Sequence, residues 1–417
     1  MLTASQLLDA LLERARAPRA TETVATADAL GRVLAAPVTS TLTVPPLDNS
    51  AMDGYAVRVA DVPAAGTRLP VSQRIQAGEV GAPLAAGTAA RIFTGAPVPP
   101  GADAVLMQEV CTPLPDPLPQ TGEGANAAPR PADDGAAVVV GKLPVAGENI
   151  RRAGEDIRAG TEILAAGARL GPAEMGLAAS VGLGELNVFR RLKVACFFTG
   201  DELVTPGAPL GPGQIYNSNR YTLTGLLKGM GCELIDLGIV PDTLEATAAA
   251  LARAAAEADV IVTSGGVSVG EADYVKAAVE RLGRVEMWKV AMKPGKPIVY
   301  GRVGEADFVG LPGNPVSAFA TFGLFVRPFL LKRMGAARVL YRAFPVRSAS
   351  AWPKPGDRRE FLRARLTEDG RVELFPNQSS GVLTSCAWAD GFVDLEIGLT
   401  IQPGDWVRFI PFSELLE

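Results

Sequence analysis

Histidine is absent from the 417-residue chain. Its absence excludes Ser-His-Asp triads, Cys-His dyads and histidine-ligated zinc or iron sites, because each of these requires an imidazole ring. Any chemistry must therefore depend on carboxylates, lysines, arginines, hydroxyls and backbone amides.

Aromatic and excess basic residues are scarce as well. Base stacking on single-stranded nucleic acid needs aromatic side chains, and the chain has only 15 Phe, 6 Tyr and 4 Trp. The formal net charge is −5, which is the wrong sign for a protein that binds a nucleic-acid backbone. We expect no nucleic-acid partner, and a phosphate ligand would have to bind in a local pocket.

Long apolar runs and closely spaced cysteines are lacking too. The longest apolar run, from Val316 to Val326, is too short to span a bilayer, and Asp9 and Glu13 interrupt the apolar N-terminal stretch. The four cysteines form no CxxC pair, which indicates reduced structural thiols. These absences predict a cytoplasmic protein without a membrane partner.

Enough apolar material is present for several buried cores. Apolar residues make up 48% of the chain and charged residues 20%, as expected for a globular protein. At about 150 residues per domain, the length predicts roughly three domains.

The first half of the chain combines a helix with a β-rich tract. Thr3 and Gln6 form a capping-box pattern before leucines at helical spacing, which predicts an amphipathic helix at the N-terminus. From about residue 45 to 141, short apolar runs alternate with Gly and Pro, which is typical of strands and turns. Residues 112–135, rich in Pro, Gly and Asp, are predicted to be a surface loop between two strands.

From about Arg191 the pattern changes to apolar strands that alternate with helices, which predicts a doubly wound α/β domain with a parallel sheet. Asp242 and Glu245 form a second capping-box pattern at the start of one of these helices. From about residue 336 to 417 the strands are short and bounded by turns, which predicts a small all-β domain.

Three glycine-rich or polar turns follow strands of the α/β part, at residues 199–202, 263–273 and 310–317. Ligands bind at this edge of open parallel sheets, because helix N-termini leave unpaired amides there. In the third turn Asn314 suits an N-cap and Pro315 suits the first helical position, so the surrounding amides could receive an anion. A single turn of this kind usually only reverses the chain, but three on one edge predict a ligand site.

Cations and acids accompany these turns. Lys289, Lys293 and Lys296 lie within eight residues, and they indicate either a solvated surface loop or, at this edge, a cluster that binds phosphate or an oxyanion. Four acids on the same edge would suit Mg²⁺, which prefers oxygen ligands; they are Asp201, Glu202, Glu271 and Asp273.

Nine strings, in order over nearly the whole chain, resemble the MoeA family of molybdopterin molybdenumtransferases, which includes the C-terminal part of gephyrin. They are PPLDNSAMDGYAVR (45–58), RIFTGAPVPPGADAV (91–105), NIRRAGEDI (149–157), FFTGDELV (197–204), GQIYNSNR (213–220), SGGVSVGEADY (264–274), WKVAMKPGKP (288–297), GLPGNPVSA (310–318) and REFLRARL (359–366).

The resemblance implies four domains. They are a discontinuous helical domain (1–45 and 143–175), an inserted β-rich domain (46–142), a molybdopterin-binding α/β domain (176–332) and a C-terminal β-barrel (336–417). It also implies an elongated homodimer, whose cleft combines the α/β domain of one subunit with the inserted domain of the other. The implied reaction inserts molybdate into adenylylated molybdopterin and releases AMP with the help of Mg²⁺.

The same resemblance implies roles for individual residues. The catalytic set is Glu202, Asp273, Lys289, Lys293, Asp53, Thr94 and Asp156. The set that binds the pterin substrate is Gly265, Gly266, Ser268, Lys296, Pro312, Gly313, Asn314, Arg358 and Ser380. The metal ligands are Glu202, Asp273 and Asp201. The expected partners are adenylylated molybdopterin, molybdate, a second copy of the chain and, transiently, a molybdopterin adenylyltransferase.

The chain departs from the family pattern at Asn217, where an acid is usual; Asn keeps an oxygen acceptor but loses the charge. Two alternatives to the insertase remain open. The α/β domain could adenylylate molybdopterin itself, or the chain could be a non-catalytic scaffold that carries the cofactor.

Overall fold

The computed structural model describes residues 1–17, 20–114, 136–266 and 274–416. The chain forms two compact units. Unit 1 consists of Met1–Pro37, Ala165–Met175 and Gly184–Glu417, and unit 2 consists of Val38–Leu164 and Gly176–Leu183. Most of the predicted Pro-rich loop at 112–135 and the second half of the predicted turn at 263–273 lie outside the described residues.

A six-stranded sheet forms the centre of unit 1, in the order β16-β13-β17-β21-β20-β18. Its strands are β13 (Lys193–Thr199), β16 (Glu233–Val240), β17 (Val260–Ser264), β18 (Gly283–Lys289), β20 (Pro297–Val303) and β21 (Ala306–Leu311). The first four of this order run parallel, so the carboxyl ends of β13, β16, β17 and β21 meet at one edge.

The prediction of a parallel sheet is wrong at strand β20, which runs opposite to the other five strands. Strand β20 pairs antiparallel with both β21 and β18. Only Gly304 and Glu305 separate β20 from β21, and a connection this short closes a hairpin, because parallel neighbours need a crossover of a dozen or more residues. The sheet is therefore mixed.

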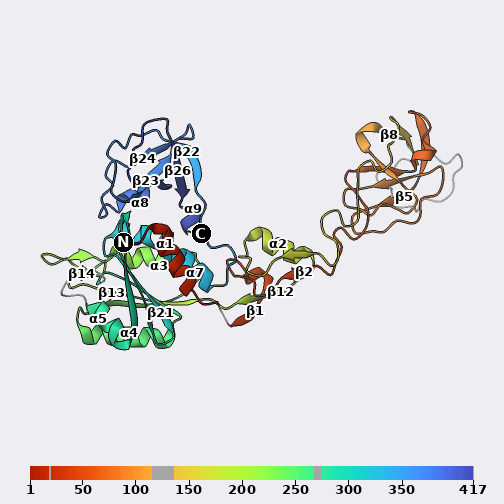
Figure 1. Cartoon of the computed structure of the whole chain (residues 1–417). Coiled ribbons are helices and arrows are strands. Elements are labelled where there is room, and N and C mark those ends of the chain that lie inside the picture. Colours follow the sequence, from red (N-terminus) through yellow and green to blue (C-terminus); the bar gives the residue numbers. More distant parts are fainter. Residues whose placement is uncertain (18–19, 115–135, 267–273, 417) are drawn as a thin grey trace. The chain divides into compact units, whose positions relative to one another are not determined.

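Helices cover both faces of this sheet (Figure 1). On one face lie α4 (Leu244–Glu257) and α5 (Tyr274–Leu282). On the other lie α1 (Ala4–Arg14), α3 (Ser218–Gly229), α6 (Pro315–Thr321), a π-helical turn (Phe322–Val326) and α7 (Arg327–Arg333). The predicted capping box of α1 is confirmed, and its Leu7 and Leu11 are fully buried in the core that α7 shares.

The N-terminus of α4 differs from the prediction. Thr243 is its N-cap and accepts a hydrogen bond from the Ala246 amide, so the capping box predicted for Asp242 is wrong. Adjacent Asp and Thr both suit an N-cap position, and the backbone conformation decides between them. Because Thr243 caps the helix, the carboxylate of Asp242 is available for another contact.

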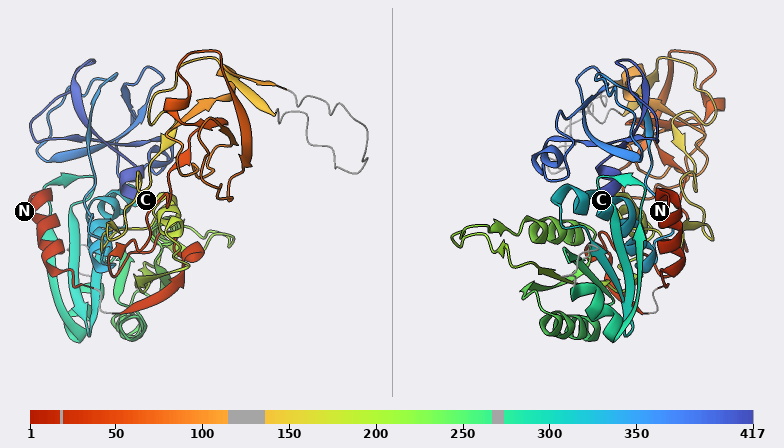
Figure 2. Two further views of the ribbon diagram at one scale, coloured as in Figure 1. Left: turned by 90° about the vertical axis from the view of Figure 1, so that its right-hand side faces the viewer. Right: turned by 60° about the vertical axis from the view of Figure 1, so that its left-hand side comes forward.

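The C-terminal part of unit 1 is a β-barrel that lies over the α/β sheet (Figure 2). Its strands are β22 (Phe344–Arg347), β23 (Arg359–Leu366), β24 (Val372–Leu374), β25 (Gly391–Leu395) and β26 (Trp406–Pro411). A bridge between Ser348 and Val372 joins the end of β22 to β24 and closes the ring. The short strand β19 (Met292–Lys293) pairs with β23, so the lysine-rich segment of the α/β part extends onto the barrel. Two short helices, α8 (Thr384–Trp388) and α9 (Ser413–Leu416), complete this part.

Unit 2 contains a second six-stranded sheet, in the order β7-β4-β6-β5-β9-β8. These strands are β4 (Gly54–Val57), β5 (Thr67–Ile75), β6 (Ala89–Ile92), β7 (Ala104–Met107), β8 (Cys111–Leu114) and β9 (Ala137–Val140). Two-stranded pairs accompany it: β3 (Asn49–Ser50) with β10 (Ile150–Arg151), and β2 (Val38–Thr39) with β11 (Glu162–Leu164). In unit 1, β1 (Thr21–Ala25) pairs with β12 (Glu185–Phe189). Helix α2 (Pro172–Ser180) begins in unit 1 and ends in unit 2. The β-rich prediction for residues 45–141 is confirmed for the described residues.

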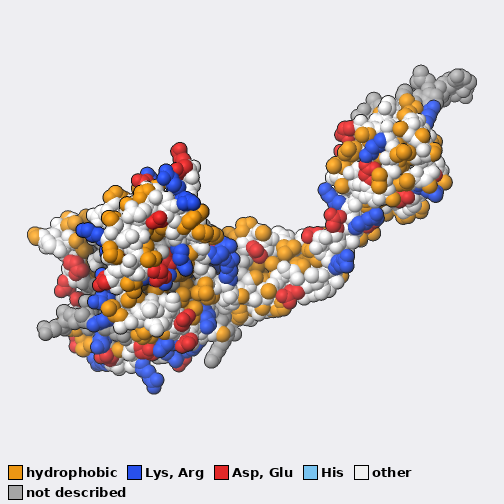
Figure 3. Space-filling model, turned by 45° about the horizontal axis from the view of Figure 1, so that its top comes forward, with side chains coloured by type: hydrophobic (Ala, Val, Ile, Leu, Met, Phe, Trp, Pro, Cys, Tyr) orange, Lys and Arg blue, Asp and Glu red, His pale blue; other side chains and the backbone are white. Residues whose placement is uncertain are grey.

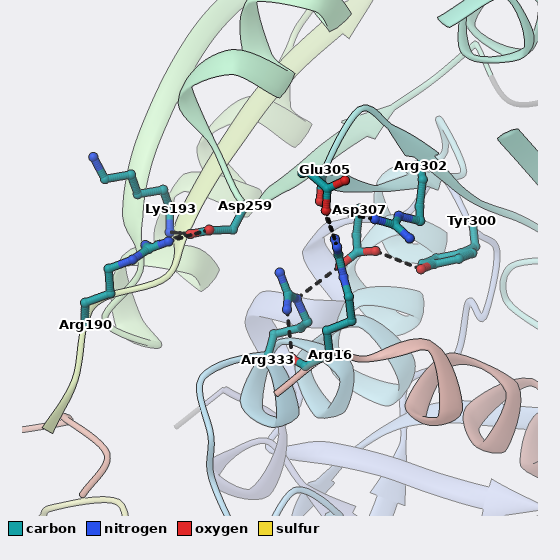
Figure 4. A network of polar contacts seen from close by, with 9 residues as sticks. All are labelled: Arg16, Arg190, Lys193, Asp259, Tyr300, Arg302, Glu305, Asp307 and Arg333. Carbon is teal, nitrogen blue, oxygen red and sulfur yellow. Dashed lines mark hydrogen bonds and ion pairs between the residues drawn. The ribbon is translucent and has the colours of Figure 1, made fainter. Parts of the chain in front are cut away.

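A cluster of ion pairs lies at the amino edge of the unit 1 sheet, and we call it the amino-edge network (Figure 4). Arg190 donates two hydrogen bonds to Asp259, at 2.6 and 2.8 Å, just before β17. Asp307, fully buried at the start of β21, accepts 2.8 Å from the Tyr300 hydroxyl and lies 3.1 Å from Arg333 Nε. The remaining members are Arg16, Lys193, Arg302 and Glu305.

Candidate functional site

A cavity of about 950 Å³ lies at the carboxyl edge of the same sheet. Its floor is formed where β13 and β17 end, at Thr199 and Ser264, and where Pro312 follows β21. The barrel contributes residues 358 and 378–380 to the wall. The predicted crevice at this edge is therefore present, and residues far apart in sequence complete it.

Two buried polar side chains fix the turns that line the floor. Asn219 on α3 donates 2.8 Å to Ser264 Oγ and 2.7 Å to the Gly313 carbonyl, and Ser264 Oγ donates 2.8 Å to the Pro312 carbonyl. Gly266 has a φ of +64°, and a Cβ there would lie 2.6 Å from a methyl carbon of Val275. A larger residue would collide with Val275 and Thr199, so only glycine fits at this position.

The N-terminus of α6 is partly occupied by the barrel. Asn314 is the N-cap, as predicted, but its side chain makes no capping bond, and Pro315 follows it. The amide of Val316 donates 3.0 Å to the carbonyl of Ser380. One of the amides expected to receive an anion therefore holds the barrel segment in place instead.

Cations gather where the lysine-rich segment meets the barrel. Lys293 Nζ lies 3.0 Å from Glu360 Oε1, and Trp352 Nε1 donates 2.8 Å to the other oxygen of that buried carboxylate. Arg358 donates a long bond of 3.4 Å to the Met292 carbonyl. Lys296 lines the cavity and forms no ion pair within the described part of the chain. We call Lys293, Lys296 and Arg358 the cationic wall.

Two carboxylates line another part of the cavity, Glu202 and Asp242. Asp242 Oδ1 accepts 2.8 Å from the hydroxyl of Thr199, which fixes its position above the end of β13. A Cβ built on Gly200 would lie 2.7 Å from Glu202 Oε2, so the glycine makes room for this carboxylate. Asp242 was missed as a site residue, although its position directly after β16 is the signal that identified the other turns.

Not all predicted residues line the cavity. Of the three lysines, Lys289 ends the outermost strand β18, and it lies beside Met1, Leu2 and Trp288 rather than in the cavity lining. Gly265, Gly266, Pro312, Gly313, Asn314, Arg358 and Ser380 do line it. Asp201 is exposed and is not among the lining residues, while Ser268, Glu271 and Asp273 lie outside the described residues.

The three remaining predicted residues belong to unit 2. Asp53 Oδ1 accepts hydrogen bonds from the amide and the hydroxyl of Thr94, at 2.8 and 2.7 Å. These two bonds lower the pKa of Asp53, so it is a carboxylate at neutral pH. Asp156 is exposed, and its backbone amide donates a hydrogen bond to the carbonyl of Val44.

Asn217, which stands where the family usually has an acid, is the N-cap of α3. Its side-chain oxygen accepts 3.1 Å from the Arg220 amide, and the residue is 2% exposed. Asn and Asp cap helices equally well, so this role survives the loss of charge. The side-chain nitrogen of Asn217 is buried without a hydrogen-bond partner.

Family models match three consecutive regions of the chain. Residues 2–182 match the MoeA N-terminal region (domain I and II), residues 195–332 match a probable molybdopterin binding domain, and residues 345–412 match the MoeA C-terminal region (domain IV).

Curated relatives match over most or all of their length. The chain is 38% identical over 424 residues to a molybdopterin molybdenumtransferase of Haemophilus influenzae, with 100% of both chains covered. It is 40% identical to molybdopterin molybdenumtransferase 2 of Mycobacterium tuberculosis, covering 89% of this chain and 90% of that one. A crystal structure of a molybdopterin biosynthesis MoeA protein from Pyrococcus horikoshii is similar with a TM-score of 0.74, at 32% identity and 99% coverage of both chains.

Proposed function

The chain belongs to the MoeA family of molybdopterin molybdenumtransferases, and we propose that its carboxyl-edge cavity is the site where molybdenum is transferred to molybdopterin. The resemblance expected from the sequence motifs is thereby confirmed at the level of the family. A role in molybdenum cofactor biosynthesis as a transferase follows from the names of the curated relatives.

The observation that supports this site best is the unbalanced charge of its wall. Lys296 lines the cavity without an ion pair among the described residues. The other two cations of the wall are paired, Lys293 with Glu360 at 3.0 Å and Arg358 with the exposed Asp357 at 3.4 Å. Molybdate is a dianion and molybdopterin bears a phosphate, so preorganised cations would neutralise charge where it is densest. The lining hydroxyls of Ser317 and Ser380 can donate hydrogen bonds to the same oxygens.

In the finer proposal, the pterin substrate is adenylylated and AMP leaves as molybdate is inserted. The cationic wall would hold the oxyanion, and the open turns at Gly266 and Gly313 would let the phosphate approach the backbone. A charged substrate is held in place by fixed groups, so little reorganisation is needed during the reaction. No histidine is required for this chemistry.

Glu202 and Asp242 would hold Mg²⁺ in this proposal. The described residues contain no group of three His, Cys, Asp or Glu side chains that could hold a metal. Mg²⁺ commonly binds through one or two carboxylates together with substrate phosphates and waters, and two oxygen-donating carboxylates fit that pattern. When bound, the ion would neutralise charge on the phosphate whose bond to AMP breaks. The predicted ligand Asp273 lies outside the described residues.

The other expectations stay predictions. A homodimer, in which Asp53, Thr94 and Asp156 of one copy complete the cleft of the other, is consistent with the carboxylate and hydroxyl chemistry of these residues. The four-domain division and a cytoplasmic location stay predictions as well. No helix among the described residues is both long and apolar enough to cross a membrane.

The reaction can be tested with purified protein, adenylylated molybdopterin and Mg²⁺. We expect AMP to be released only when molybdate is added. AMP release that is indifferent to molybdate would contradict the insertase and favour chemistry at the adenylyl group alone. Full cofactor binding without any turnover would instead favour a scaffold that carries the cofactor.

A further inference from the structure

One buried arginine of the barrel has no ion-pair partner among the described residues. Arg363 on β23 is 1% exposed, and it forms no ion pair within the described residues. Its neighbour on the same strand, Arg359, differs, because its guanidinium is bound by both oxygens of Asp394 at 2.6 Å. A buried charge normally requires a charged partner, since desolvation is costly. Burial accordingly lowers the pKa of Arg363 to about 10, which keeps it charged at neutral pH.

The hydrogen bonds of Arg363 all go to neutral acceptors. Its Nε donates 3.0 Å to Ser385 Oγ, and its terminal nitrogen donates 3.2 Å to the Ser379 carbonyl and 3.5 Å to that of Asn377. Its backbone also binds Gln378, whose side chain accepts from the Arg363 amide and donates to its carbonyl, both at 2.9 Å. These acceptors satisfy the donors of Arg363 but carry no formal charge, and Glu360, which acts on Arg363 through its charge, is already paired with Lys293.

Two of the residues that Arg363 holds, Gln378 and Ser379, also line the cavity. Together with the adjacent Ser380 and with Arg358 they form its barrel wall. Ser380 is fixed on the other side as well, because its carbonyl accepts from the Val316 amide of α6. The segment from residue 377 to 380 is therefore held between a buried cation and a helix N-terminus.

We propose that Arg363 is a positioning residue for the oxyanion substrate: it holds the 377–380 segment against the cavity and supplies a charge whose counter-ion is the bound anion. The inference rests on the proposed function, because it takes molybdate as that anion. The cationic wall lines the cavity itself, whereas Arg363 acts through Gln378 and Ser379. Its charge is little screened by salt, since it is buried.

The test compares molybdate binding by calorimetry on the full-length protein and three variants. Arg363→Met removes both the positive charge and the guanidinium hydrogen bonds to Ser385 and Ser379, and we expect molybdate affinity to fall about tenfold. Arg363→Lys keeps the positive charge but loses the planar guanidinium group and its hydrogen bonds, and we expect molybdate affinity to fall about threefold. The matched control is Arg365→Met, two residues further along β23, which breaks an exposed pair with Glu373 and a cation–π contact with Trp388. That variant should bind within about twofold of the wild type.

A merely structural role would give a different pattern. If Arg363→Met lowered the melting temperature and the turnover number but left the molybdate affinity and the KM for molybdate unchanged, the inference would be overturned. Should Arg363→Met fail to fold, an unchanged affinity of Arg363→Lys would overturn it equally. If the wild type itself bound no molybdate, the proposed function would fail, and this inference with it; that result is distinct from a wild type that binds and a variant that binds equally well.

Discussion

The two edges of the unit 1 sheet carry similar side chains but use them differently. At the amino edge, Asp259 and Asp307 are each bound by an arginine, and the charges are satisfied within the protein. At the carboxyl edge, Lys296 has no ion-pair partner among the described residues, and Asp242 is bound only by the neutral Thr199 hydroxyl. Internally paired charges stabilise the fold, whereas charges left unpaired around a cavity are available to a ligand.

The surface of unit 1 supports this contrast. Basic and acidic side chains are interspersed on the face shown in Figure 3. On this face the charges form no extended field of one sign, which agrees with anion binding by a local arrangement such as the cationic wall. The net charge of −5 agrees with this local origin.

The largest predicted effect breaks the amino-edge network. Arg333→Met leaves the fully buried Asp307 without its nearest cation, and removing one partner of a buried pair typically costs about 3–5 kcal/mol. Urea unfolding should show this loss, while the folded variant keeps the wild-type affinity for molybdate. Arg302→Met, which breaks an exposed pair with Glu305, should cost at most about 1 kcal/mol. If Arg333→Met and Arg302→Met lowered the free energy of unfolding equally, the structural role of the network would be contradicted.

The next effect concerns the carboxyl edge. Lys296→Ala removes a cation that no acid of the described residues pairs with, so the melting temperature should hardly change. The turnover number should fall about 100-fold, the usual effect of losing one group that stabilises developing negative charge. AMP release is the measurement, with Lys228→Ala, an exposed lysine of α3, as the control. If Lys296→Ala lowered the melting temperature but kept the wild-type turnover number, Lys296 would stabilise the fold rather than bind the ligand, and the contrast between the two edges would be wrong.

A smaller effect is expected for Asp242→Asn. The amide can still accept the hydrogen bond from Thr199 but loses the charge that would attract Mg²⁺. The Mg²⁺ concentration for half-maximal activity should rise by about tenfold, as expected for a perturbed metal site. Titration of activity with MgCl₂ measures it, and an unchanged midpoint would remove Asp242 from the metal site.

The smallest predicted effect is the contribution of the amino-edge network to the pH dependence of the free energy of unfolding. Burial alone would raise the pKa of Asp259, but the hydrogen bonds from Arg190 and from the Lys193 amide outweigh it and lower the pKa below 3.8. A depressed pKa contributes stability that is fully present above about pH 4 and is lost as the pH falls through the folded value. Arg190→Met should therefore make the free energy of unfolding less dependent on pH below 4. If the free energy of unfolding fell equally steeply with pH in the wild type and in Arg190→Met, this prediction would be contradicted.

The sequence predicted the parts of the cavity that are local in the chain. Turns after β13 and β21, glycines at 265, 266 and 313, and the start of α6 at Asn314 could be read from strand and capping patterns. Each depends on neighbours within a few residues, which a linear pattern contains.

The remaining features depend on pairing over long distances. Lys293 meets Glu360, 67 residues away, because β19 adds to the edge of β23, and no local pattern indicates that pairing. The sequence pattern predicts Asp242 as the helix cap instead of Thr243, because both residue types cap helices well. Only the backbone angles identify Thr243 as the N-cap. The placement of Lys289 outside the cavity follows from β18 being the outermost strand.

The central claim is that the cationic wall at the carboxyl edge, and not the cluster of arginines at the amino edge, binds the oxyanion. A crystal soaked with molybdate tests it directly, because molybdenum can be located by anomalous scattering. We predict a molybdenum peak beside Lys293, Lys296 and Arg358. A peak instead in the hollow of about 230 Å³ among Arg16, Arg190 and Arg333, with none in the cavity, would contradict the account.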